Sequence, residues 1–120
     1  MNAKTTVYDF VVNFNQFIEN VYGLTVEAYN NSLIDRIYPD AVYDKLNNYQ
    51  IALESTLEKS TVNVEKSLQI LKEIMIDIRS KARLINDMYN MTGSLEYCET
   101  YKFLNSVRDC YNEFINDLFN

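Results

Sequence analysis

Apolar residues recur between Val64 and Tyr89 at a spacing that alternates between four and three residues. The eight positions, which contain no miss, are Val64, Leu68, Leu71, Met75, Ile78, Ala82, Ile85 and Tyr89. Such an alternation keeps one stripe of a helix facing a nearly parallel partner helix, as in coiled-coil packing. The segment is therefore predicted to be a long helix that lies along another helix.

The N-terminal part of the chain shows two shorter helical periods. The first begins at Thr6, whose hydroxyl can cap a helix, and its stripe is Phe10, Phe14, Phe17 and Val21. Gly23 interrupts it, and the pattern does not decide between a kink and a turn. The second period, which is Val26, Tyr29, Leu33 and Ile37, leads to Tyr38-Pro39-Asp40. Proline disfavours a continuing helix, so residues 38–40 are predicted to be the strong breaker.

A third helix is predicted over residues 41–59. One face carries Val42, Leu46, Tyr49, Leu53 and Leu57. Ser60 and Thr61 can cap the following helix. The alternative is one continuous helix over residues 41–91 with a four-residue insertion in its heptads. We favour a break near Ser60, because the continuous helix would be about 75 Å long.

The last helix is predicted over residues 95–119, after a left-handed cap at Gly93 and a start at Ser94. Two adjacent apolar stripes cover about half of its circumference. They comprise Tyr97, Tyr101, Leu104, Tyr111 and Ile115, and Phe103, Val107, Cys110 and Phe114. A helix with so much apolar surface contacts more than one neighbour. It is either the centre of a bundle or half of a dimer contact.

These periods predict an all-α fold: an antiparallel bundle of four to five helices with coiled-coil-like packing. Two glycines and one proline supply few turns, which also favours long helices. The 120 residues fit a single domain, residues 1–120. The amount of apolar surface further predicts a homodimer.

The charge narrows the range of partners. Seventeen acidic and eleven basic residues give a net charge of −6, which disfavours binding to nucleic acid or to an anionic membrane. No segment approaches the roughly 20 apolar residues of a membrane span, so we expect a cytoplasmic protein. Fifteen asparagines, with abundant isoleucine, tyrosine and lysine, suggest an AT-rich genome, as in low-GC bacteria, phages or large DNA viruses.

Candidate chemistry is sparse. The chain has no histidine, which removes the commonest general base and the Glu-x-x-His motif of di-iron bundles. Cys98 and Cys110 lie about 18 Å apart on one predicted helix, too far for a disulfide, which requires less than about 7 Å. We therefore expect no catalytic residues, no cofactor, no metal site and no enzymatic activity.

One surface pattern stands out in the helix that carries the 4–3 stripe. Lys72, Arg79 and Arg83 project within about 40° of one another, with Ile76 beside them. An apolar anchor between cations suits an acidic protein partner. A solvated charged face, balanced by Glu65 and Asp87, is the more common origin of such a pattern.

The leading functional hypothesis is a non-enzymatic protein–protein interaction module. Its sharper form is an inhibitor or immunity-type factor from a phage or mobile element. Two alternatives stay open. One is a helical bundle that binds a small nucleotide-type ligand, with tyrosines for stacking and Arg79 or Arg83 for phosphate. The other is a structural or assembly subunit.

Overall fold

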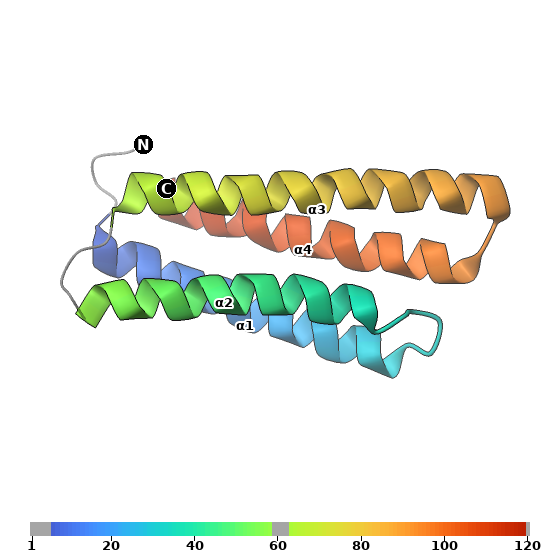
Figure 1. Ribbon diagram of the computed structural model, residues 1–120, viewed down its shortest axis with the longest axis horizontal. Coiled ribbons are helices and arrows are strands. Elements are labelled where there is room, and N and C mark those ends of the chain that lie inside the picture. The colour runs from blue at the N-terminus through green and yellow to red at the C-terminus, as the bar shows by residue number, and fades with distance from the viewer. Residues whose placement is uncertain (1–5, 59–62, 120) are drawn as a thin grey trace.

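The computed structural model describes residues 6–58 and 63–119, and this part of the chain is an all-α bundle without strands. Its helices are α1 (Val7–Asn30), α2 (Ile37–Glu58), α3 (Val64–Thr92) and α4 (Leu95–Phe119). Successive helices run in opposite directions, and the α3–α4 hairpin extends beyond α1 and α2 at one end (Figure 1). The prediction of an all-α antiparallel bundle is confirmed.

Helix α1 begins as predicted and then continues through Gly23. The Thr6 hydroxyl accepts a hydrogen bond from the Asp9 backbone N–H at 3.0 Å, which caps the helix. Gly23 is an exposed residue within the continuous helix Val7–Asn30, so no turn occurs there. The buried stripe continues through Thr25 and Ala28.

The predicted second helical period, Val26, Tyr29, Leu33 and Ile37, does not form one face of a helix, because α1 ends at Asn30 and α2 starts at Ile37. The side chains of Val26, Leu33 and Ile37 are exposed, the last of them by 69 %. The threonine at position 25 and the small Ala28 take the core positions of this part of α1. Thr25 is tolerated there because its hydroxyl donates to the Tyr22 carbonyl oxygen at 2.6 Å.

The break between the first two helices lies at residues 31–36, before the predicted breaker. Pro39 is the third residue of α2 and is fully buried. A proline in the first turn costs little, because its missing N–H would have no acceptor within the helix. The turn depends instead on Asn31 and Asp35, whose side-chain oxygens accept from the N–H groups of Leu33 and Ile37, each at 3.0 Å.

Residues 41–91 are divided between two helices, as we favoured. Helix α2 ends at Glu58 and α3 starts at Val64, where Asn63 caps it by accepting from the Lys66 N–H at 3.0 Å. The candidate caps Ser60 and Thr61 and the side chain of Leu57 lie outside the described residues. At the other end of α3, Gly93 adopts the predicted left-handed conformation with φ 68°.

The apolar stripe of α3 faces the interior of the bundle. Its members are buried except for Leu68 and Tyr89, which are half-buried. Helix α4 packs against both α1 and α3, so its broad apolar arc is used within one chain. Most of the two surfaces that motivated the homodimer is thus internal. Self-association stays a prediction.

Aromatic rings form the densest part of the core and join helices that are far apart in sequence. Phe14 of α1 lies 5.9 Å from Phe114 of α4 and 5.4 Å from Tyr49 of α2, measured between ring centroids. Phe10 and Phe17 also contact Phe114, at 5.8 and 5.5 Å. Offset and edge-to-face pairs of this kind contribute about 0.5–1.5 kcal/mol each beyond their buried area.

The two glycines predict opposite effects of the same substitution. A Cβ at Gly23 meets nothing within 4 Å, so Gly23→Ala should stabilise the protein by about 0.5–1 kcal/mol through helix propensity. Gly93→Ala should destabilise it by about 1 kcal/mol, because φ 68° is strained for alanine. Urea unfolding of both variants checks this pair, and an equal sign for the two would contradict it.

The interior of α3 should not accept a charge. Ile78 is buried, so Ile78→Asp places an unpaired carboxylate in the core at a cost of several kcal/mol, comparable to the stability of a small domain. Ile51 of α2 provides the matched control, because its side chain is 57 % exposed. Ile51→Asp should change stability by less than about 0.5 kcal/mol. Circular dichroism during thermal unfolding distinguishes the two.

Candidate functional site

The stripe formed by Lys72, Ile76, Arg79 and Arg83 lies on the outer surface of α3. All four side chains are exposed, and that of Ile76 is 55 % exposed. Their spacing of four, three and four residues places them on one helical face, beside the buried stripe but outside it. The structure therefore brings the four predicted partner-binding residues together on one surface.

The cations of this stripe differ from most of the others in their contacts. Lys45 and Lys81 both pair with Asp77, at 2.9 and 3.3 Å, and Lys102 pairs with Glu99 at 3.3 Å. Within residues 6–58 and 63–119, Lys72, Arg79 and Arg83 form no ion pair. The predicted balance from Glu65 and Asp87 thus does not involve direct contacts among the described residues.

The Asp77 site shows what pairing does in this protein. The hydrogen bond from Lys45, with that from Lys81, holds the pKa of the Asp77 carboxyl below its usual range, although partial burial opposes the effect. Its two lysines come from α2 and α3, so the site links these helices. These two lysines therefore form contacts within the fold, whereas the cations of the stripe form no ion pair among the described residues.

An open groove of about 440 Å³ adjoins the stripe between α3 and α4. Its apolar wall consists of half-buried side chains, and Glu65, Gln69 and Lys72 lie along its α3 side. The apolar members are Leu68, Tyr111, Ile115 and Phe119. Lys72 belongs to both the groove and the stripe, so the two features form one continuous surface.

Arg108 of α4 is a residue that the sequence analysis missed. At 100° per residue it lies within about 20° of Ile115 and Phe119, which places it on the groove side of α4. Its Nε is buried and has no hydrogen-bond partner in the described part of the chain. The spacing from Arg108 to Ile115 was visible in the sequence, but only the packing shows that this face of α4 borders α3.

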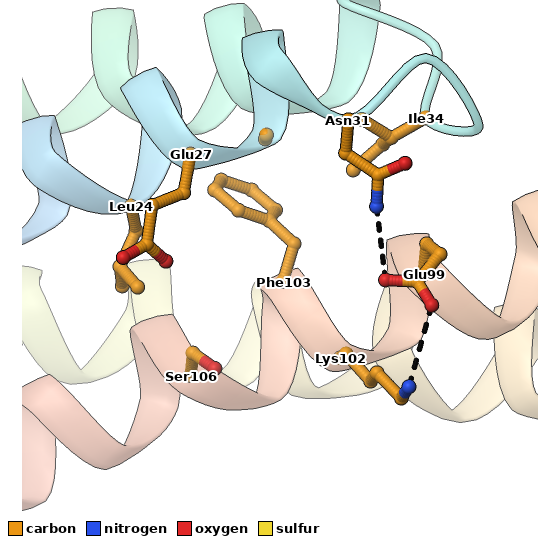
Figure 2. Close-up of a pocket in the computed structure, with 9 residues that line it drawn as sticks. Leu24, Glu27, Asn31, Ile34, Glu99, Lys102, Phe103 and Ser106 are labelled. Atoms are coloured by element: carbon orange, nitrogen blue, oxygen red, sulfur yellow. Dashed lines mark hydrogen bonds and ion pairs between the residues drawn. The ribbon is translucent and has the colours of Figure 1, made fainter.

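A smaller cavity of about 150 Å³ lies between α1 and α4, and Phe103 points across it toward α1 (Figure 2). Three of its polar side chains, Asn31, Glu99 and Lys102, contact one another. The Glu99 carboxylate accepts from the Asn31 amide at 3.0 Å through one oxygen and pairs with Lys102 through the other. That contact also raises the pKa of Lys102. The cavity is below the roughly 300–1,000 Å³ that small-molecule sites occupy.

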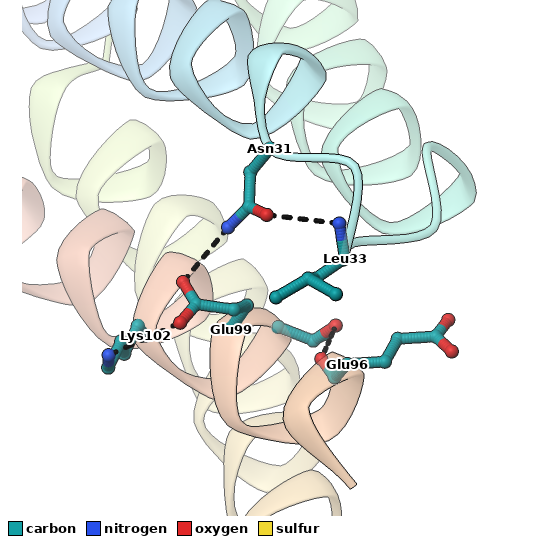
Figure 3. A network of polar contacts seen from close by, with 6 residues as sticks. Asn31, Leu33, Glu96, Glu99 and Lys102 are labelled. Carbon is teal, nitrogen blue, oxygen red and sulfur yellow. Dashed lines mark hydrogen bonds and ion pairs between the residues drawn. The ribbon is translucent and has the colours of Figure 1, made fainter.

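The Asn31 side chain acts as a structural joint between the α1–α2 turn and α4 (Figure 3). Its carbonyl oxygen accepts from the Leu33 N–H within the turn, and its amide donates to Glu99 of α4. One side chain thus shapes the turn and fixes it to the bundle. This arrangement explains the polar cluster without a ligand.

A third hollow lies between α2 and α3 and has a volume of about 390 Å³. Tyr49 crosses this boundary, and its hydroxyl donates to the Ser67 carbonyl oxygen at 2.6 Å. Burial raises the pKa of Tyr49, although the hydrogen bond to Ser67 opposes the shift. The hollow thus includes a contact that holds α2 to α3.

The side chains with the most potential for chemistry in the described residues are the carboxylates and the two cysteines. Among them, no group of three or more His, Cys, Asp or Glu side chains is placed to hold a metal ion. Cys98 and Cys110 are both free, as their positions on α4 require. Burial raises the pKa of the Cys110 thiol, and the nearby Glu113 and Asp109 add to this, which disfavours the reactive thiolate.

Comparison with protein-family models, with curated proteins and with solved structures gave no match. None of the helices among the described residues is both long enough and apolar enough to cross a bilayer. The features of the molecule that bear on function are therefore the exposed stripe of Lys72, Ile76, Arg79 and Arg83 and the groove beside it.

The Tyr49 contact predicts a pH-dependent effect on stability. Tyr49→Phe should cost about 1 kcal/mol at neutral pH, because it removes one hydrogen bond. The raised pKa means that the contribution of Tyr49 is complete below pH 10 and is lost as the pH rises through the folded-state pKa. The difference from wild type should narrow above pH 10. Urea unfolding at pH 7 and pH 10.5 tests this, and a constant difference would contradict it.

Proposed function

We propose that this chain is a non-enzymatic protein-binding module whose partner contacts centre on Lys72, Ile76, Arg79 and Arg83. One observation carries the proposal. An exposed isoleucine is surrounded by three exposed cations that form no ion pair within the described residues, on a chain of net charge −6. Apolar anchors and arginines are typical of the side chains that dominate binding energy at interfaces.

A solvated charged face remains the competing explanation for this stripe. Scattered exposed apolar residues are normal on protein surfaces, so Ile76 alone has little weight. The combination with three cations and a neighbouring apolar groove favours a binding role. In its sharper form, the module is an inhibitor or immunity-type factor that occupies the acidic surface of one target protein.

A double substitution separates the two explanations. Ile76→Ala with Arg79→Ala should leave the fold intact, because both side chains lie outside the core. Binding to the partner should weaken by about 1–3 kcal/mol, or roughly 5- to 150-fold in Kd. The partner is first captured from source cells with the wild-type protein, and its affinity for each variant is then measured by calorimetry.

Ile51→Ala with Lys66→Ala is the matched control. It also removes one exposed isoleucine and one exposed cation without an ion pair among the described residues, but from α2 and from the α2–α3 hollow. This variant should bind like wild type. Equal affinities for all three proteins would assign the α3 stripe to the solvated surface.

A further inference from the structure

The groove between α3 and α4 and the stripe of Lys72, Ile76, Arg79 and Arg83 form one continuous surface, which we call the track. Leu68 and Lys72 of α3 line the groove with Tyr111 and Ile115 of α4. Helices α3 and α4 run in opposite directions (Figure 1). One turn further along α3 from Lys72 and one turn back along α4 from Tyr111 therefore bring Ile76 and Arg108 to similar levels. From Leu68 to Arg83 the track is about 22 Å long, which matches a helix of about four turns.

The two components of this track call for different chemistry in a ligand. At one end, the apolar side chains Leu68, Tyr111, Ile115 and Phe119 are only half-buried and can accept apolar anchors. Toward the other end, Ile76 adds one exposed anchor between cations. A ligand with apolar residues along one face therefore fits better than a purely polar chain.

The charge along the track is predominantly positive. The described residues contain nine lysines and arginines, because Lys4 and Lys59 of the eleven lie outside them. Four of the nine already contact an acid or an aromatic ring, namely Lys45, Lys81, Lys102 and Arg36. Of the other five, only Lys66 lies away from the track, and Lys72, Arg79, Arg83 and Arg108 lie along it. Glu65 is the acidic residue at the groove end.

These observations favour one class of ligand over nucleic acid. A nucleic acid would meet the cations but would leave the apolar wall unsatisfied, and it would be repelled by a chain of net charge −6. An amphipathic helix with acidic flanks supplies both components, with anchors at i, i+3, i+4 and i+7. Its carboxylates can form bidentate pairs with the arginines.

We propose that the track between α3 and α4, from Leu68 and Phe119 to Arg83, seats an acidic amphipathic helix of the partner protein. This inference rests on the proposed function and specifies the partner segment by its chemistry. Leu68, Tyr111, Ile115 and Phe119 hold its apolar face. Lys72, Arg79, Arg83 and Arg108 hold its carboxylates.

Selection from a random peptide library tests the proposal without knowledge of the partner. A displayed library of 18-residue peptides is enriched on the wild-type protein and depleted on the charge-reversed variant Arg79→Glu with Arg83→Glu. We expect enriched sequences that are acidic and have apolar residues at helical spacing. Enrichment of basic sequences, of sequences without that spacing or of none at all would overturn the proposal.

Binding of an enriched peptide is then measured by fluorescence anisotropy. The charge-reversed variant should weaken binding at least tenfold, because attraction becomes repulsion at two positions. Lys66→Glu is the matched control and should change the affinity by less than about twofold, apart from long-range effects that added salt screens. A scrambled peptide of identical composition should bind at least tenfold more weakly than the enriched one. Equal binding of the scrambled peptide would indicate only general charge attraction and would overturn the proposal.

Three further measurements locate the ligand and exclude the other occupants. Methyl NMR signals of Leu68 and Ile115 should shift on peptide binding, whereas that of Ile51 should not. Tighter binding of a single-stranded or duplex DNA oligonucleotide than of the peptide would overturn the proposal in favour of nucleic acid. A micromolar dimer that dissociates in the charge-reversed variant would overturn it in favour of a second copy of this chain.

The proposed function and this inference can fail separately. If the captured partner loses affinity for the Ile76→Ala, Arg79→Ala variant but no acidic amphipathic peptide is enriched, the module binds through the stripe and the helical ligand is wrong. If the partner binds all variants equally while such a peptide is enriched at the track, the track is competent but is not the site of the proposed function.

Discussion

The contact between Phe14 and Phe114 determines how the four helices are arranged. These rings are 100 residues apart in sequence and lie 5.9 Å apart in the structure. Phe10 and Phe17 pack on the same Phe114 ring, and Tyr49 brings α2 to Phe14. Long-range contacts of this kind must offset the entropy of closing a long loop, and large aromatic side chains supply the most buried area per residue. The α1–α4 interface is thereby closed at the end that contains the N-terminus of α1.

This closure accounts for the exposed surface as well as the core. Once α1 occupies one side of α4, the opposite side of its apolar arc is left for α3. The arc is wider than the buried apolar stripe of α3 can cover, so Tyr111, Ile115 and Phe119 remain half-buried at the edge. The groove beside Lys72 is thus a consequence of the α4 arc and of the narrow 4–3 stripe that packs on it. The same geometry places Arg108 next to that edge.

The sequence predicted the fold class because the strongest patterns belong to residues with one dominant role. The phenylalanines of α1 and the 4–3 stripe of α3 are apolar at regular spacing, and tertiary packing leaves them little alternative. Prediction failed where a residue type has two uses. Thr25 resembles a surface residue until its hydroxyl finds the Tyr22 carbonyl, and Pro39 resembles a terminator until it lies in a first turn. The Asn31–Glu99 contact joins positions 68 residues apart, and no local pattern in one sequence encodes such a pair.

The candidate site, like the fold, could be predicted from the sequence only in part. Lys72, Ile76, Arg79 and Arg83 are on one helix, so helical geometry alone placed them together. The groove is formed by two helices. In the sequence analysis, Tyr111 and Ile115 belonged to an apolar arc that served either the bundle centre or a dimer contact, and Arg108 and Phe119 had no assigned role. Only the packing shows that Arg108, Tyr111 and Ile115 lie beside the exposed stripe of Lys72, Ile76, Arg79 and Arg83.

The ion pairs among the described residues leave the cations along the track unpaired, which favours binding of an acidic partner there. A protein with six more acids than bases has an excess of carboxylates available to its lysines and arginines. Lys45 of α2 pairs with Asp77 of α3 and so joins two helices, whereas Lys81 and Lys102 pair with acids about one turn away in their own helices. Among the described residues, Lys72, Arg79, Arg83 and Arg108 form no ion pair, although acids are abundant in the chain. Exposed ion pairs contribute only about 0–1 kcal/mol to the free energy of unfolding, so the protein loses little stability by leaving these cations unpaired. Binding of an acidic partner depends more strongly on whether the cations are paired. A paired cation would have to exchange one carboxylate for another, whereas an unpaired cation can attract an acidic partner from solution and bind it directly.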